Sequence, residues 1–174
     1  RYQNPTNVTL PLDRRQAIAR IARRHDLTII ESDIYGTLAD SVDAPLRHLA
    51  PERTYMVSSF GRIAGAGMKV GWLIGPPGAL KQTQIGVAMS TGFASPLMVE
   101  LACRMLTSGM MQRMVEWQRD ENRDRLTILR SFPTLSGARG DPVSGHVWLT
   151  LPDPWRAEDL VDTAARELGV NIAP

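Results

Sequence analysis

The chain has 174 residues, of which 43% are hydrophobic and 22% are charged, and this composition excludes an intrinsically disordered protein. Its 20 basic and 18 acidic residues give a net charge of +2, which is too small to indicate a nucleic-acid-binding surface by itself. One cysteine excludes an intramolecular disulfide, and no apolar run is long enough to span a membrane, so we expect a cytoplasmic protein.

The first part of the chain predicts one helix followed by three short strands. Apolar residues at helical spacing predict an amphipathic helix within residues 10–26, with Asp13 placed to start it. Short apolar runs predict strands at 27–30, 53–59 and 70–75, each buried on both faces. A helix that leads into short buried strands predicts a layered α/β sheet.

Two helices are predicted after these strands. The first covers residues 77–87. The second has Ser95 as its N-cap, Pro96 in its first turn and Gly109 at its other end, which is the expected punctuation of a helix. The single cysteine, Cys103, has apolar neighbours in the second helix, so we expect its side chain in the hydrophobic core.

A long helix over residues 111–131 combines apolar positions with a charged stretch, and this pattern suits a connector between two domains. After it, a turn-rich segment leads into a strand at 146–152 and a helix within 156–170 that runs into a short terminal strand. We place a domain boundary inside the long helix, so that residues 1–115 form the first domain and residues 116–174 form the second.

Polar side chains gather where the first two predicted strands end, and in open α/β sheets this is the edge where ligands bind. These side chains are Asp33, Tyr35, Ser58, Ser59, Arg62 and Lys69. A carboxylate keeps a neighbouring pyridinium nitrogen protonated, a phenol can hydrogen-bond a ring oxygen, and hydroxyl and ammonium groups can hold a phosphate. Taken one at a time, the same residues also fit ordinary roles in turns, in the core or on the solvated surface.

The order of three motifs carries a resemblance to a known class of enzymes. QNPTN at 3–7, ESDIYG at 31–36 and SSFGRIAGAGMKVGW at 58–72 resemble successive motifs of the fold-type I pyridoxal-phosphate enzymes, which share the aspartate-aminotransferase-like fold. The later segments TGFASPLMVELACRML, WQRDENRDRL and HVWLTLPDPWRAEDLV resemble the aminotransferase-like half of MocR-type regulators in the GntR superfamily. The resemblance implies an α/β fold in which part of the large-domain sheet, with its helices, is followed by most of a smaller α+β domain.

The resemblance also implies a set of residues that bind pyridoxal 5′-phosphate: Asn4, Asp33, Tyr35, Ser59, Arg62 and Lys69. Asn4 and Tyr35 match the residues that contact the phenolic oxygen of the cofactor, and Asp33 matches the carboxylate that faces its pyridine nitrogen. Ser59 matches a phosphate-binding serine, and Lys69 stands in the place of a phosphate-binding arginine.

The main departure from the family pattern concerns catalysis. Arg62 stands where the family has the lysine that forms a Schiff base, and a guanidinium stays protonated and cannot attack a carbonyl. Lys69 is an alternative amine, although the resemblance directs it at the phosphate. Asn7 replaces a glycine of the first motif, which is a mild change because asparagine tolerates left-handed backbone angles. We therefore expect a binding pocket without a catalyst, in which Arg62 anchors an anion.

These patterns predict an effector-sensing, aminotransferase-like domain of a MocR-type regulator, cut from a longer protein and with little or no transaminase activity. The resemblance implies three partners: a small-molecule effector such as an amino acid or pyridoxal phosphate, DNA bound through a winged helix outside this chain, and a second copy in a homodimer. The alternatives are a fragment of a class I or II aminotransferase and a ligand-free dimerisation module. His25, His48 and His146 lack metal-ligand spacing, so we predict no metal site and a surface or core role for each.

Overall fold

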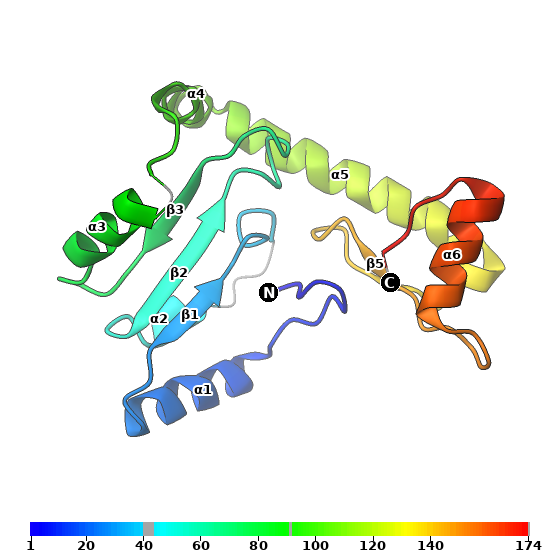
Figure 1. The fold of residues 1–174 in the computed structure, drawn as a ribbon, viewed down its shortest axis with the longest axis horizontal. Helices are drawn as coiled ribbons and strands as arrows, with labels where there is room; N and C mark the ends of the chain where they lie inside the picture. The colour runs from blue at the N-terminus through cyan, green and yellow to red at the C-terminus, as the bar shows by residue number, and fades with distance from the viewer. Residues whose placement is uncertain (40–43, 91, 174) are drawn as a thin grey trace.

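A computed structural model of the chain describes residues 1–39, 44–90 and 92–173 (Figure 1). Its elements are, in chain order, α1 (Leu12–Arg24), β1 (Ile29–Ser32), α2 (Leu46–Leu49), β2 (Thr54–Ser59), β3 (Gly71–Ile74), α3 (Leu80–Ser90), α4 (Pro96–Thr107), α5 (Met110–Arg130), the 3-10 helix η1 (Pro133–Leu135), β4 (Arg139–Gly140), β5 (Val147–Trp148) and α6 (Ala157–Leu168). The predicted α/β class is confirmed, because the first three strands form one sheet with helices before and after it.

The sheet has the strand order β1-β2-β3. β1 runs parallel to β2, with Ser32 opposite Val57, and β2 runs antiparallel to β3, with Ser59 opposite Gly71. The carboxyl ends of β1 and β2 therefore meet at one edge of the sheet, and β3 begins at that edge. We call it the carboxyl edge, and it is where the sequence predicts the site.

The main hydrophobic cluster is built from segments that flank the carboxyl edge and from two helices. Its buried members are Tyr35, Leu38, Phe60, Ile63, Met68, Val70, Ala102, Met105, Met111, Val115 and Val143. The ring of Phe60 packs against that of Trp72 in β3, with the ring centroids 4.7 Å apart. Burial of apolar surface is the dominant favourable term in folding. The candidate site therefore lies next to the hydrophobic cluster that contributes most to the stability of the fold.

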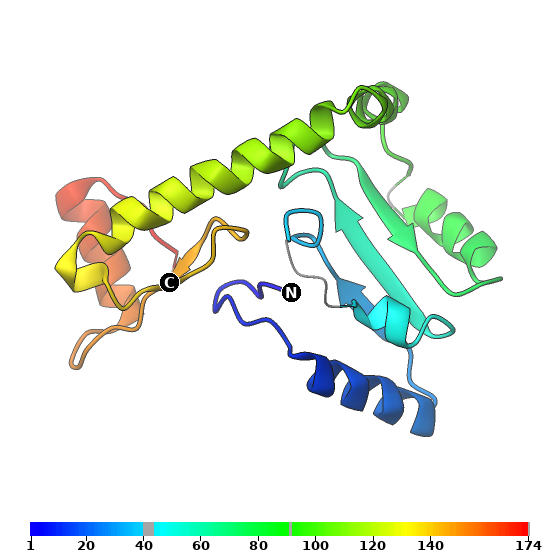
Figure 2. The ribbon, with the colours of Figure 1, turned by 180° about the vertical axis from the view of Figure 1, so that it is seen from behind.

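Helix α5 joins the two ends of the molecule. Figure 2 shows it as one continuous helix that runs from the sheet and α4 toward β5 and α6. Met111 and Val115 near its start belong to the hydrophobic cluster, and Arg119 donates hydrogen bonds to the carbonyl oxygens of Leu38 (2.7 Å) and Ala39 (2.9 Å). The predicted long helix is confirmed, whereas the domain boundary near residue 115 stays a prediction.

The first strand is less buried than its apolar sequence predicts. β1 lies at the edge of the described sheet, and its side chains alternate, so that Ile29 is half-buried while Ile30 is 77% exposed. The expectation of burial on both faces is therefore wrong for β1. An apolar run predicts a strand, but it does not distinguish a strand covered on two faces from one covered on a single face.

Two further expectations are wrong. Cys103 is exposed, because the buried stripe of α4 passes through Ala102 and Met105 and each residue of a helix turns the side chain by about 100°. Gly169 ends α6 in a left-handed conformation, with φ of 64°, and no strand follows within residues 169–173. The strand predicted at 146–152 is confined to the two residues of β5.

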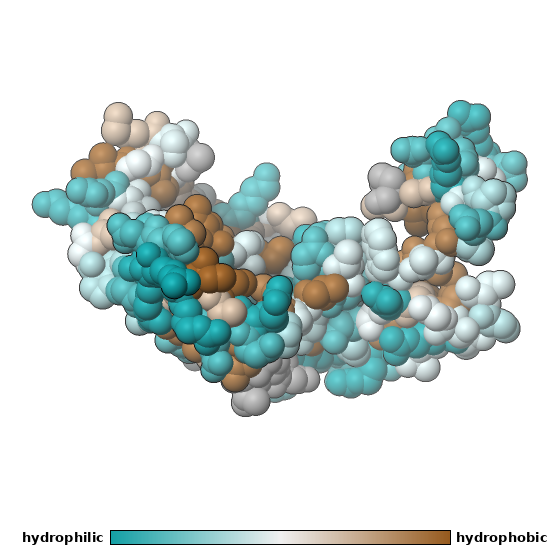
Figure 3. Space-filling model, turned by 90° about the horizontal axis from the view of Figure 1, so that it is seen from below, coloured by the Kyte–Doolittle hydropathy of each residue, from teal (hydrophilic) through white to brown (hydrophobic). Residues whose placement is uncertain are grey.

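Large hydrophobic side chains stay exposed on α3, on α4 and between them. None of the described residues of α3 is buried, and the side chains of Met89, Phe93 and Leu97 are among the most exposed apolar groups. Figure 3 shows hydrophobic patches among hydrophilic surface on one face of the molecule. Exposed apolar surface of this kind is typical of an interface. No helix in the described ranges combines the length and the apolar character needed to cross a membrane.

Candidate functional site

Asp33 is tied to β2 through its backbone. Its amide donates a hydrogen bond to the carbonyl oxygen of Val57 (2.9 Å), and its own carbonyl oxygen accepts one from the hydroxyl of Ser58 (2.8 Å). Asp33 is 5% exposed, so its carboxylate is held at the carboxyl edge with little access to water. A charge buried in this way is stable only when a partner compensates it.

The partner of Asp33 is Arg1. The guanidinium donates from Nε to Oδ1 (3.0 Å) and from Nη2 to Oδ2, so it binds both oxygens of the carboxylate. The hydrogen bonding to Asp33 raises the pKa of Arg1 above its ordinary value. The sequence does not predict this role for Arg1, because 32 positions separate the two residues and only the folded chain brings them together. The one available signal was its place two residues before the QNPTN motif.

Tyr35 lies between two residues that come from distant parts of the chain. It is 3% exposed, and the guanidinium carbon of Arg62 stands 5.4 Å from the centre of its ring. The hydroxyl of Tyr35 is 3.5 Å from Nδ1 of His146. The structure thus brings together two predicted site residues, Tyr35 and Arg62, in a cation–π contact.

The QNPTN turn reaches the site region through its last residue. Asn7 has a φ of 59°, which is a left-handed conformation, and its Nδ2 donates to the carbonyl oxygen of His146 (2.9 Å). Asparagine is one of the few residues that enter this region readily, so the observed angle fits the expectation of a mild replacement, which stays a prediction. Asn4, which precedes a cis proline, is exposed.

The two residues predicted to bind phosphate lie near the neck of the loop between β2 and β3. The amide of Phe60 donates to the carbonyl oxygen of Val70 (3.0 Å), which continues the pairing of Ser59 with Gly71. Ser59 is half-buried, and Lys69 is exposed. Among the described residues, no hydrogen bond joins Asn4, Ser59 or Lys69 to the carboxylate of Asp33 or to Tyr35.

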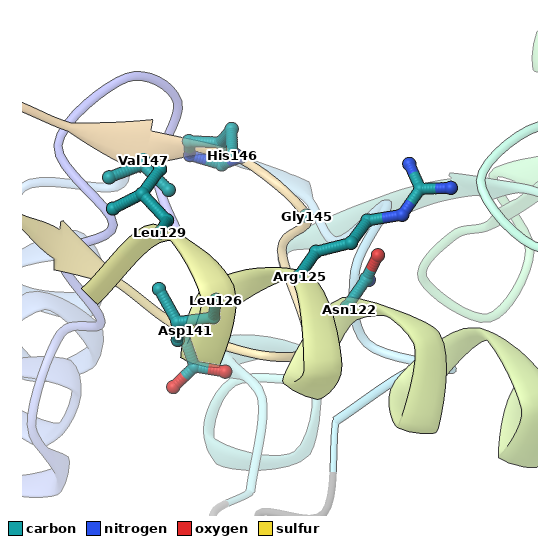
Figure 4. Close-up of a pocket in the computed structure, with 8 residues that line it drawn as sticks. All are labelled: Asn122, Arg125, Leu126, Leu129, Asp141, Gly145, His146 and Val147. Atoms are coloured by element: carbon teal, nitrogen blue, oxygen red, sulfur yellow. The ribbon is translucent and has the colours of Figure 1, made fainter. Parts of the chain in front are cut away.

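A cavity of about 180 Å³ lies between α5 and the β4–β5 pair (Figure 4). It is lined by Asn122, Arg125, Leu126, Leu129, Asp141, Gly145, His146 and Val147. Nε2 of His146 is buried and has no hydrogen-bond partner among the described residues, while Nδ1 faces Tyr35. The sequence predicts only a surface or core role for His146, and 111 positions in sequence separate it from Tyr35.

The relatives of the chain include transcriptional regulators and aminotransferases, although no family model matches it. It is 23% identical to the HTH-type transcriptional regulator YdeF of Bacillus subtilis, covering 98% of this chain and 37% of that protein. It is 27% identical to the pyridoxine biosynthesis regulator PdxR of Corynebacterium glutamicum, covering 98% and 38%. It is 24% identical to aromatic-amino-acid aminotransferase 1 of Thermococcus litoralis, covering 99% and 43%. The chain thus spans less than half the length of these curated relatives.

Solved structures decide the fold. An archaeal alanine:glyoxylate aminotransferase matches 99% of this chain and 45% of its own with a TM-score of 0.81 at 23% identity. LysN of Thermus thermophilus, solved with N-(5′-phosphopyridoxyl)-L-leucine, matches 95% and 45% with a TM-score of 0.79 at 23% identity. The chain has the fold-type I aminotransferase fold. With the two groups of relatives, this fold confirms the resemblance to the aminotransferase-like domain of a MocR-type regulator.

The residues of this fold-type I domain include polar groups that suit the binding of pyridoxal phosphate, but position 62 lacks the amine for covalent attachment. A buried carboxylate, a phenol, a hydroxyl and two exposed cations are the kinds of group that bind an anionic pyridine ligand, and Arg1 binds both oxygens of the carboxylate. Position 62, however, presents a guanidinium packed against Tyr35 and offers no amine for a Schiff base. The donor set therefore fits a ligand that is bound without a covalent link at this position.

Proposed function

We propose that the chain is the effector-sensing, aminotransferase-like domain of a MocR-type transcriptional regulator, and that it binds an anionic pyridine ligand without catalysing transamination. The observation that carries the proposal is the contact of Arg62 with Tyr35 at the position of the Schiff-base lysine. A guanidinium keeps its proton at every physiological pH and is not a nucleophile. It is, however, a strong partner for carboxylate and phosphate groups.

Pyridoxal phosphate, when bound, would supply an aldehyde and an electron-withdrawing ring. Asp33 would face the ring nitrogen, while Asn4 and Tyr35 would contact the phenolic oxygen. Ser59 and Lys69 would bind the phosphate, where the ammonium of Lys69 provides charge but lacks the two-pronged geometry of arginine. Arg62 would supply a further cation for the phosphate or for the carboxylate of an effector.

The regulators among the relatives support the proposed partners. In the whole protein, DNA would be bound by a winged helix that is not part of this chain, and the effector would be an amino acid or pyridoxal phosphate. A cytoplasmic homodimer fits both groups of relatives and the exposed apolar side chains of α3 and α4. The division into residues 1–115 and 116–174 is proposed on the same basis.

An aminotransferase fragment is the second candidate function, and the enzymes among the relatives favour it. It requires an amine that forms the Schiff base. Lys69 is the nearest lysine in sequence to position 62, and its exposed side chain lies next to Val70, at the neck of the loop that Phe60 and Val70 close. A test for covalent attachment therefore separates the two candidates.

The test is borohydride reduction of the full-length protein in the presence of pyridoxal phosphate, followed by peptide mass spectrometry. We expect no phosphopyridoxyl group on any lysine of the wild-type domain. The matched variant Arg62→Lys should gain such a group at position 62, because it restores the amine that the fold positions there. A modified Lys69 in the wild type would contradict the proposal and favour the enzyme.

A further inference from the structure

The Arg1–Asp33 ion pair is a well-defined, largely buried contact at the carboxyl edge. Both side chains are largely buried, at 12% and 6% exposure, and the guanidinium occupies both oxygens of the carboxylate. Paired hydrogen bonds of this kind are among the strongest in proteins and fix the relative orientation of the two groups. Asp33 is in turn held to β2 through its amide and carbonyl groups, so the pair is anchored to the sheet.

Gly36 makes room for this pair. A Cβ atom at position 36 would overlap Oδ2 of Asp33 and would lie 2.5 Å from Nη2 of Arg1. Any residue larger than glycine would thus push the guanidinium off the carboxylate or displace the turn after β1. The chain therefore provides a partner for Asp33 and also the space that this partner needs.

We propose that Arg1 is a positioning residue which, by holding both oxygens of Asp33, makes the site bind its pyridine ligand with a neutral ring nitrogen. This inference rests on the proposed function, because it takes Asp33 as the residue that faces the ring. A free carboxylate favours a protonated ring nitrogen, since the opposite charge stabilises the pyridinium. A carboxylate already neutralised by a guanidinium gives that stabilisation only weakly, and a second cation beside Arg1 is disfavoured.

This pairing has a consequence for what the site can do. A neutral pyridine ring withdraws electrons less than a pyridinium does, so it is a weaker electron sink. Arg1 would thus lower the reactivity of the ligand by a route separate from the loss of the lysine at position 62. Both features point in the same direction, toward a site that recognises a ligand and does not transform it.

The test uses full-length protein loaded with pyridoxal phosphate that carries ¹⁵N at the ring nitrogen, with solid-state NMR at neutral pH as the readout. In the wild type we expect the ¹⁵N resonance of an unprotonated pyridine. In Arg1→Met and Arg1→Gln the resonance should move to that of a pyridinium, because both variants remove the positive charge that neutralises the carboxylate of Asp33. The second variant keeps an amide that can hydrogen-bond Asp33, so it covers the case in which Arg1→Met does not fold.

The matched control is Arg20→Gln, which removes an exposed arginine from α1 and should leave the wild-type resonance in place. A pyridinium resonance in the wild type, or the same resonance in wild type and Arg1→Gln, would overturn the inference while leaving the proposed ligand site intact. Binding by Arg1→Gln and not by the wild type would also overturn it, since the wild-type pair would then exclude the ligand instead of holding it with a neutral ring nitrogen. Failure of every variant to bind pyridoxal phosphate would overturn the cofactor site itself, and with it this inference.

Discussion

The proposed ring end of the candidate site, around Asp33, and its proposed phosphate end, around Arg62 and Lys69, are built in different ways. At the ring end, Asp33 is buried, tied to β2 and paired with Arg1. At the phosphate end, Arg62 and Lys69 are exposed on the loop between β2 and β3. Asp33 is therefore held in place by contacts within the protein, whereas Arg62 and Lys69 present exposed cations. Substitutions at the two ends should therefore differ in their effect on the free energy of unfolding.

The largest loss in the free energy of unfolding is expected for Asp33→Asn, which tests the buried ion pair at the proposed ring end. The variant leaves the guanidinium of Arg1 largely buried without its counter-charge, and breaking a buried pair in this way costs about 3 kcal/mol. Urea denaturation of wild type and variant measures the difference. The control is Asp120→Asn, whose pair with Arg123 is exposed and should contribute less than about 0.5 kcal/mol. Equal losses of unfolding free energy in the two variants would contradict the claim that the buried Arg1–Asp33 pair stabilises the fold more than an exposed pair does.

A somewhat smaller effect is expected for Gly36→Ala. The added methyl group meets the Arg1–Asp33 pair, and overpacking of a close contact costs about 2 kcal/mol. Gly67→Ala is the matched control, because Gly67 lies in the phosphate-end loop and a Cβ there meets no atom within 4 Å. Thermal unfolding of the two variants gives the comparison. A Gly36→Ala protein as stable as Gly67→Ala would show that the turn after β1 does not hold the pair closely.

The smallest effect is expected at the exposed end, for Arg62→Ala. Its cation–π contact with Tyr35 is made by an exposed side chain, and such contacts contribute about 0.5 kcal/mol. The same urea experiment measures it, with Arg20→Ala as a control for the removal of an exposed arginine. If Arg62→Ala loses as much free energy of unfolding as Asp33→Asn, the two ends of the site do not differ in their contribution to stability.

The sequence predicts the placement of Asp33, Tyr35 and Arg62 because their positions follow from strand ends. Each comes just after a strand, and the parallel pairing of β1 with β2 brings those ends to one edge. The cation–π contact between Tyr35 and Arg62 lies within this predicted group. The roles of these residues toward a cofactor stay predictions.

The remaining features depend on contacts that periodicity does not encode. Arg1 and His146 enter the site from segments 32 and 111 residues away from their partners, so only the closed tertiary structure shows their roles. Cys103 is wrongly predicted as buried because apolar neighbours in sequence do not define which stripe of α4 faces the core. The terminal strand fails for a similar reason, since a strand requires a partner that a local pattern does not identify.

The most direct test of the account is a crystal structure of the full-length protein grown with pyridoxal phosphate. We expect the ring beside Asp33 at the carboxyl edge and separate electron density for the ligand and for the side chain of Arg62. Continuous density between the C4′ atom of the ligand and any nitrogen of the polypeptide would contradict the claim that this domain binds without covalent catalysis.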